Sequence, residues 1–88
     1  MPTLRCEIVT PEGPVFDGEV EYLEAPGSEG WFGVLAHHAA MVTALGTGTL
    51  MFRLPDGKEE RWPIQGGFFE VSNNRATVLA DSVGKPTG

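Results

Sequence analysis

Clusters of glycine and proline interrupt the chain about every eight to twelve residues, and short runs rich in apolar residues lie between them. This spacing is typical of strands joined by tight turns and predicts an all-β sandwich or barrel. A chain of 88 residues suffices for one hydrophobic core, so we expect a single domain. The expected strands cover residues 4–9, 15–25, 49–54, 59–65, 68–71 and 76–80.

Residue types predict several details of these strands. Gly18 indicates a bulge or bend in the second strand, and Asp56-Gly57 indicates a hairpin because this pair suits the primed turns. Pro63 argues for an edge position or an interruption, since proline cannot donate a hydrogen bond to a neighbouring strand. The run 76–80 is almost wholly apolar, and we expect a central strand covered on both faces.

Two segments depart from the strand-and-turn pattern. The segment from Ala36 to Leu45 contains good helix formers, and its apolar residues fall near helical spacing. From the pattern alone we expect a short helix here. Residues 84–88 hold two glycines and a proline without an apolar anchor, and we expect a flexible tail.

The charge balance narrows the classes of partner. Twelve acidic residues oppose six basic ones, for a net charge of −6, and the excess acid lies in residues 1–29. Nucleic-acid binding needs lysine and arginine at the phosphates, so we expect no nucleic-acid partner.

The single Cys6 has no disulfide partner and is expected to be a small buried hydrophobe. No stretch is apolar for long enough to span a membrane, and no signal peptide is present, so the sequence indicates an intracellular, soluble protein.

Candidate metal and phosphate sites are weak. His37 and His38 are adjacent and would point to opposite faces of a strand, and no further ligand spacing accompanies them. The glycines at 27, 30 and 33 match no phosphate-binding loop, and Glu29 would repel a phosphate. We therefore expect no metal, no cofactor-binding residue and no catalytic residue.

Trp31 and Phe32 are adjacent aromatic residues beside a glycine-rich turn. Side chains of neighbouring strand residues point in opposite directions. One ring is therefore expected in the core and the other toward a partner. We assign burial to Phe32 and presentation to Trp31, with a core position for Trp31 left open.

Six stretches, in order along residues 4–83, carry a family resemblance. They read Ile8-Val9-Thr10-Pro11-Glu12, Phe16-x-Gly18-Glu19-Val20, Ala25-Pro26-Gly27-Ser28-Glu29-Gly30-x-x-Gly33-Val34-Leu35, His38-Ala39-x-x-Val42-Thr43-Ala44-Leu45-x-x-Gly48, Gly66-Gly67-Phe68-x-Glu70-Val71 and Ala76-Thr77-Val78-Leu79-Ala80-Asp81. Together they resemble the epsilon subunit of F-type ATP synthases. No single motif is decisive, but their collinear order is specific.

The resemblance implies a two-sheet β-sandwich of about ten short strands, with a domain over 1–83 and a tail over 84–88. It replaces the helix at 36–45 by loop and strand. The implied role is that of a central-stalk subunit, which catalyses nothing itself and helps to couple proton flow through the membrane c-ring to ATP synthesis or hydrolysis. The implied location is the cytoplasmic face of the bacterial inner membrane, peripheral and without insertion.

The resemblance also implies which residues lie at interfaces, because each one occupies the position of an interface residue in the family. The resemblance implies contact with the polar loops of the c-ring and with the gamma subunit. The implied c-ring residues are Gly27, Ser28, Glu29, Gly30 and Trp31. The implied gamma-subunit residues are Thr10, His38, Ala39, Met41 and Thr43.

The chain departs from the family at several positions. Ala36-His37 stands where the family has Pro-Gly, Ala40 where it has proline, and Trp31 where an acid is common. The C-terminal helical hairpin common in the family is not in the sequence, and we expect a naturally short form without ATP binding. A free-standing ligand- or peptide-binding sandwich is the alternative function, and a metal-dependent hydrolase using His37 or His38 is a third.

Overall fold

The computed structural model describes residues 2–88 and contains eight strands in that range. The strands are β1 (Leu4–Thr10), β2 (Gly13–Val20), β3 (Tyr22–Gly27), β4 (Gly30–Leu35), β5 (Met41–Ala44), β6 (Thr47–Arg53), β7 (Glu59–Ser72) and β8 (Arg75–Val83). The resemblance implied about ten short strands. The lower number arises partly because β7 continues for 14 residues.

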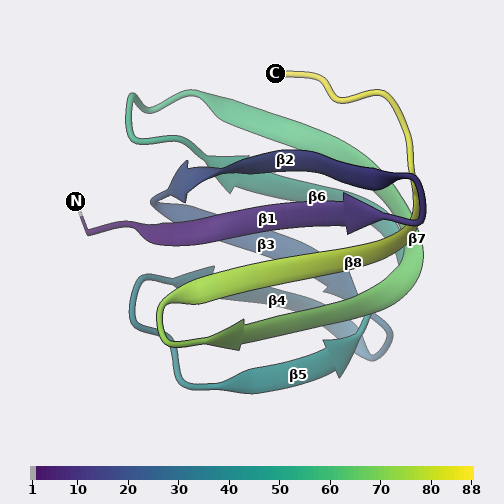
Figure 1. The fold of residues 1–88 in the computed structure, drawn as a ribbon, viewed down its shortest axis with the longest axis horizontal. Coiled ribbons are helices and arrows are strands. Elements are labelled where there is room, and N and C mark those ends of the chain that lie inside the picture. The colour runs from purple at the N-terminus through teal and green to yellow at the C-terminus, as the bar shows by residue number, and fades with distance from the viewer. Residues whose placement is uncertain (1) are drawn as a thin grey trace.

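The strands form two layers that share β7 (Figure 1). The hydrogen-bonded order is β2-β1-β8-β7-β6-β3-β4, and β5 pairs with β7 off this path. The second half of β7 lies between β8 and β5, whereas its first half pairs with β6 in the other layer. All pairs are antiparallel except β1 with β8. The all-β sandwich prediction is confirmed.

A pair of glycines turns β7 from one layer into the other. Gly66 and Gly67 have φ values of +62° and +114°, which side chains rarely allow. A Cβ atom at Gly67 would overlap the carbonyl oxygen of Leu79 on β8. The strand can therefore bend here only because neither residue has a side chain.

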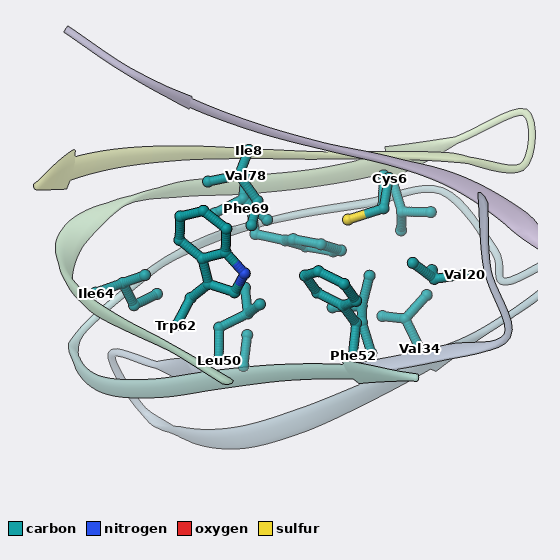
Figure 2. Close-up of a cluster of buried hydrophobic side chains, with 14 of the residues drawn as sticks. Cys6, Ile8, Val20, Val34, Leu50, Phe52, Trp62, Ile64, Phe69 and Val78 are labelled. Carbon is teal, nitrogen blue, oxygen red and sulfur yellow. The ribbon is translucent and has the colours of Figure 1, made fainter. Parts of the chain in front are cut away.

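The core lies between the two layers and is closed by aromatic rings (Figure 2). Phe52 from β6 and Phe69 from the second half of β7 are both fully buried and come from opposite layers. Phe16 contacts Phe52 with ring centroids 4.4 Å apart, and Phe32 contacts Phe69 at 5.0 Å. These tilted pairs add to the free energy gained by burying the rings. Trp62 is almost fully buried, and its indole N–H donates to Glu60.

Residues 15–25 form two strands, so the prediction of one strand is wrong. The chain bends at Glu21, which leaves β2 in one layer and β3 in the other. The bulge expected at Gly18 is also wrong, because Gly18 pairs in register with Cys6 and the irregularity lies between Ile8 and Val9. Gly18 instead lies under the ring of Phe16, which would be 3.2 Å from a Cβ atom there.

The helix that periodicity predicted over 36–45 is wrong, and the loop and strand that the resemblance implied are present. Residues 36–40 form a loop, and Met41–Ala44 form β5. Backbone pairing with β7 outweighs the helix propensity of this segment, because an isolated helix of about ten residues is only marginally stable even when it contains good helix formers.

The other local predictions have mixed outcomes. Pro63 pairs with Thr49 on β6 and lies beyond the last β7–β8 pair, but its carbonyl accepts from the Gly84 amide over 2.7 Å. The predicted edge position therefore holds only with respect to the named strands. β8 is central, between β1 and β7, but it is covered on one face only, because Leu79 is half exposed. The flexible tail over 84–88 stays a prediction. In the structure Thr87 exchanges two backbone hydrogen bonds with Arg61.

We expect Gly67→Ala to destabilise the folded protein strongly. The new methyl group would overlap the Leu79 carbonyl oxygen, and the φ of +114° is unfavourable for alanine. The expected loss is about 3 kcal/mol or more of unfolding free energy, measured by urea denaturation. Gly57→Ala is the matched control, since Gly57 also has a positive φ but has no atom within 4 Å of its Cβ position. Equal losses in the two variants would contradict a steric role for Gly67.

Cys6 is expected to resist thiol reagents in the native protein. Its side chain is fully buried, and burial raises the pKa of the thiol to about 12. At pH 8 only about one thiol in ten thousand would be ionised. We expect the reaction with Ellman's reagent to follow the unfolding curve in urea, and rapid labelling without denaturant would disprove this.

Candidate interaction surfaces

The turn between β3 and β4 is a two-residue hairpin that projects from one end of the sandwich. Gly27 pairs with Gly30, which leaves Ser28 and Glu29 exposed at the tip. Gly30 has a φ of +135°, so a side chain there would be strained. The amide of Ser28 donates to the carbonyl of Ala44 over 2.9 Å, which ties the turn to the end of β5. The tip is therefore presented by a fixed backbone.

Three other chain reversals lie at the same end of the sandwich (Figure 1). They are the β1–β2 turn, the passage from β5 to β6 and the bend in β7. Hydrogen bonds join two of them, because the amide of Gly66 donates to the carbonyl of Gly46 over 3.1 Å. The predicted c-ring residues are thus part of one connected surface at the end of the domain.

Trp31 and Phe32 point in opposite directions, as the alternation predicted. Trp31 is 59% exposed, whereas Phe32 packs against Phe69 in the core. Trp31 pairs across the strands with Pro26, and its ring lies beside Gly48. A Cβ atom at Gly48 would be 2.9 Å from Pro26 Cβ and 3.5 Å from the indole Cζ2 atom. A glycine at this position therefore leaves room for both side chains.

The five predicted gamma-subunit residues do not form one cluster. Thr10 ends β1 beside the β1–β2 turn, where its hydroxyl accepts from the Glu12 amide and donates to the Gly13 carbonyl. His38 and Ala39 lie in the loop before β5, at the opposite end of the sandwich (Figure 1). Met41 and Thr43 lie between them on β5, and both are partly buried.

An exposed apolar row crosses the outer face of the layer that contains β1, β8, β7 and β5. We call it the apolar row, and its members are Val9, Leu79, Phe68 and Ala44, neighbours in strand register. Phe68 is 58% exposed, and Leu79 is 49% exposed. Val42, on the same face of β5, is 68% exposed. Exposed side chains of this size are informative when they lie together.

Sequence reasoning missed the apolar row, although a signal for it was present. Phe68 and Phe69 are adjacent, so alternation along β7 had to turn one ring outward. The same alternation turns Leu79 outward between the buried Val78 and Ala80. A shallow hollow next to the row is lined in part by Thr10 and Pro11, which joins Thr10 to this surface.

The rest of this outer face is polar. Arg5 donates to Asp17 over 2.8 Å, and a second contact joins Arg5 to Glu19. The hydrogen bond from Arg5 lowers the pKa of the Asp17 carboxyl. Glu7, Thr77 and Glu70 follow in neighbouring register positions. The apolar row is therefore bordered by charge on one side.

Neither metal chemistry nor membrane spanning finds support in residues 2–88. They contain no group of three or more histidine, cysteine, aspartate or glutamate side chains placed to hold a metal ion. His38 Nδ1 lies 2.6 Å from the Ala39 carbonyl oxygen, whereas the bond from His37 to Asn74 is made by the His37 backbone amide. The same residues contain no helix that is long and apolar enough to cross a membrane.

Comparison with known proteins relates the chain to one family. The family model "ATP synthase, Delta/Epsilon chain, beta-sandwich domain" matches residues 3–86. A relative from Nitratiruptor sp. and one from Desulforamulus reducens, both named ATP synthase epsilon chain, are each 48% identical over 92% and 91% of this chain. The chain covers 63% and 60% of their lengths, so it spans about three fifths of the curated relatives that it matches.

Solved structures support the fold. The chain is similar to part of the Euglena gracilis mitochondrial ATP synthase, with a TM-score of 0.88 and 23% identity, over 96% of this chain and 54% of the other. The Tetrahymena thermophila mitochondrial ATP synthase central stalk and c-ring gives a TM-score of 0.74 at 19% identity, over 91% and 64% of the two chains. At these identities the similarity concerns the fold alone.

We expect Trp31→Ala to change the thermal midpoint little, because more than half of the side chain is exposed. The expected loss of stability is below about 1 kcal/mol, measured by thermal unfolding. Phe32→Ala is the control from the same strand and is expected to lose about 3 kcal/mol, since its ring packs on Phe69. A loss at Trp31 as large as that at Phe32 would show that Trp31 is a core residue.

Proposed function

The chain belongs to the β-sandwich family of ATP synthase delta and epsilon chains, and we propose that it acts as an epsilon-type subunit of the central stalk. In this role it joins the gamma subunit to the membrane c-ring and helps to couple proton translocation to ATP synthesis or hydrolysis. It supplies binding surfaces and no catalytic group. The complex would hold it at the cytoplasmic face of the bacterial inner membrane without insertion.

The apolar row carries the gamma-subunit part of the proposal. Phe68 and Leu79 are neighbours across β7 and β8, and both expose about half of their surface. Aromatic side chains are enriched in protein interfaces, and burying apolar surface of this kind contributes to affinity. Thr10 at one end and Val42 at the other extend the same surface. A gamma subunit seated on the row would cover all four.

The β3–β4 turn carries the c-ring part. Its tip offers Ser28 and Glu29, and Trp31 provides a large exposed ring beside them. The Glu29 carboxylate can pair with a cationic side chain of a partner loop, and the Trp31 ring can contact that cation or nearby apolar surface. The exposed charge contributes little after screening, so contact with Trp31 should dominate the affinity.

The layout of the domain supports a mechanical role. The turn tip lies at one end of the sandwich, and the apolar row lies on the side of one layer. The interior between them is fully packed, from Leu4 and Ile8 through Phe69 to Phe52. A close-packed interior deforms little under load. Force applied at the turn tip would therefore be transmitted to the apolar row, because no flexible segment of the described chain lies between them to absorb it.

We expect the double substitution Phe68→Gln with Leu79→Gln to weaken binding of the gamma subunit from the same organism by at least tenfold, because both apolar anchors are lost. Binding is measured by calorimetry or by surface capture with the full chain. Trp31→Gln is the matched control, since Trp31 is 59% exposed but lies on β4 in the other layer and is assigned to the c-ring contact. Equal affinity of wild type and the double variant would place the gamma subunit elsewhere on the domain.

A further inference from the structure

Asn74 links three segments that are distant in sequence. Its side-chain Oδ1 accepts a hydrogen bond from the His37 amide over 2.7 Å, and its Nδ2 donates to the Thr3 carbonyl over 2.9 Å. Its own carbonyl accepts from the Arg5 amide over 3.1 Å. The β7–β8 turn is thereby connected to the loop before β5 and to the start of β1.

The chemistry of an asparagine amide matches this position. One partner is an N–H donor and the other is a carbonyl acceptor, so the amide needs its oxygen toward His37 and its nitrogen toward Thr3. Asn74 also has a φ of +60°, a conformation that asparagine tolerates better than most residues. Glycine would allow the same backbone but would lose both side-chain bonds.

His37 adopts a conformation that needs support. Its φ is +65°, which is uncommon for a residue with a side chain and costs on the order of a factor of ten in population without compensation. The neighbouring backbone hydrogen bond, from the His38 amide to the Leu35 carbonyl, is long at 3.3 Å. The bond from His37 to Asn74 is therefore the strongest tether of residues 36–40.

We propose that Asn74 is a positioning residue that fixes the loop of residues 36–40, and that this loop is thereby pre-arranged for its partner. The second part rests on the proposed function and on the family position that assigns His38 and Ala39 to the gamma-subunit interface in addition to the apolar row. A loop held in one conformation before binding avoids the entropic cost of ordering it during binding. Loss of the tether should therefore weaken association and leave the core unchanged.

The first test is hydrogen exchange on the isolated full chain. Asn74→Gly is expected to lower the protection of the His37 amide by about tenfold or more, while amides of the core strands keep theirs. Asn73→Gly is the matched control, because Asn73 has a φ of +51° in the same turn and its side chain makes no hydrogen bond within residues 2–88. Identical exchange in the two variants would overturn the positioning role.

A conservative variant separates the two side-chain bonds. Asn74→Asp keeps an oxygen for the His37 amide but has no N–H for the Thr3 carbonyl at neutral pH. We expect protection of the His37 amide to return, while the amides at the start of β1 exchange faster than in the wild type. If the His37 amide is as poorly protected from exchange in Asn74→Asp as in Asn74→Gly, the hydrogen bond to Oδ1 does not hold the loop.

The second test measures binding to the gamma subunit. Asn74→Gly should weaken binding several-fold relative to Asn73→Gly. If the wild type itself does not bind, the proposed function fails, and the exchange experiment still decides the role of Asn74. If exchange changes at His37 but affinity does not, the loop is held by Asn74 without serving the interface, and the second part of the proposal is wrong.

Discussion

The architecture depends on one strand that belongs to both layers. β7 pairs with β6 through its first half and with β5 and β8 through its second half. The bend at Gly66 and Gly67 brings Trp62 and Ile64 from one half and Phe69 and Val71 from the other into a common core. Because a single covalent chain crosses between the layers, their separation and relative angle are fixed by backbone geometry as well as by side-chain packing.

Both interaction surfaces derive their geometry from this arrangement. The apolar row includes Phe68, which follows the bend directly, and the β3–β4 turn is hydrogen-bonded to Ala44 at the end of β5. β5 in turn pairs with β7 just beyond the bend. The two surfaces are therefore connected through the few residues around Gly67. In the proposed function, this short path would connect the two surfaces stiffly.

Sequence reasoning succeeded where local rules are strong. The hairpin around Asp56-Gly57 and the opposite directions of Trp31 and Phe32 follow from the chemistry of single residues. The turn spacing predicted a sandwich or a barrel, and the resemblance selected the sandwich and corrected the helix at 36–45. The boundary at Glu21 was missed because Tyr22 continues the apolar alternation of Val20, whereas in the structure the buried positions shift to Leu23 and Ala25. The change of layer itself is decided by pairing partners far along the chain.

The interaction surfaces were harder to predict than the fold. Alternation predicts that some apolar side chain must face outward from β7 and β8, but only strand register brings Phe68 beside Leu79. Register also separates Thr10 from His38, which family position alone had grouped together. The hydrogen bond from His37 to Asn74 joins residues 37 positions apart, and no local pattern predicts such a pair.

The parallel pairing of β1 with β8 has a consequence for biosynthesis. β1 is made first, yet its inner neighbour in the sheet is the last strand, which pairs with it through residues 75–79. Contacts between such distant segments form slowly, because a long loop must close before they contribute. The emerging chain therefore cannot complete this layer until residues 75–79 have left the ribosome, and until then one edge of β1 remains available to other polypeptides.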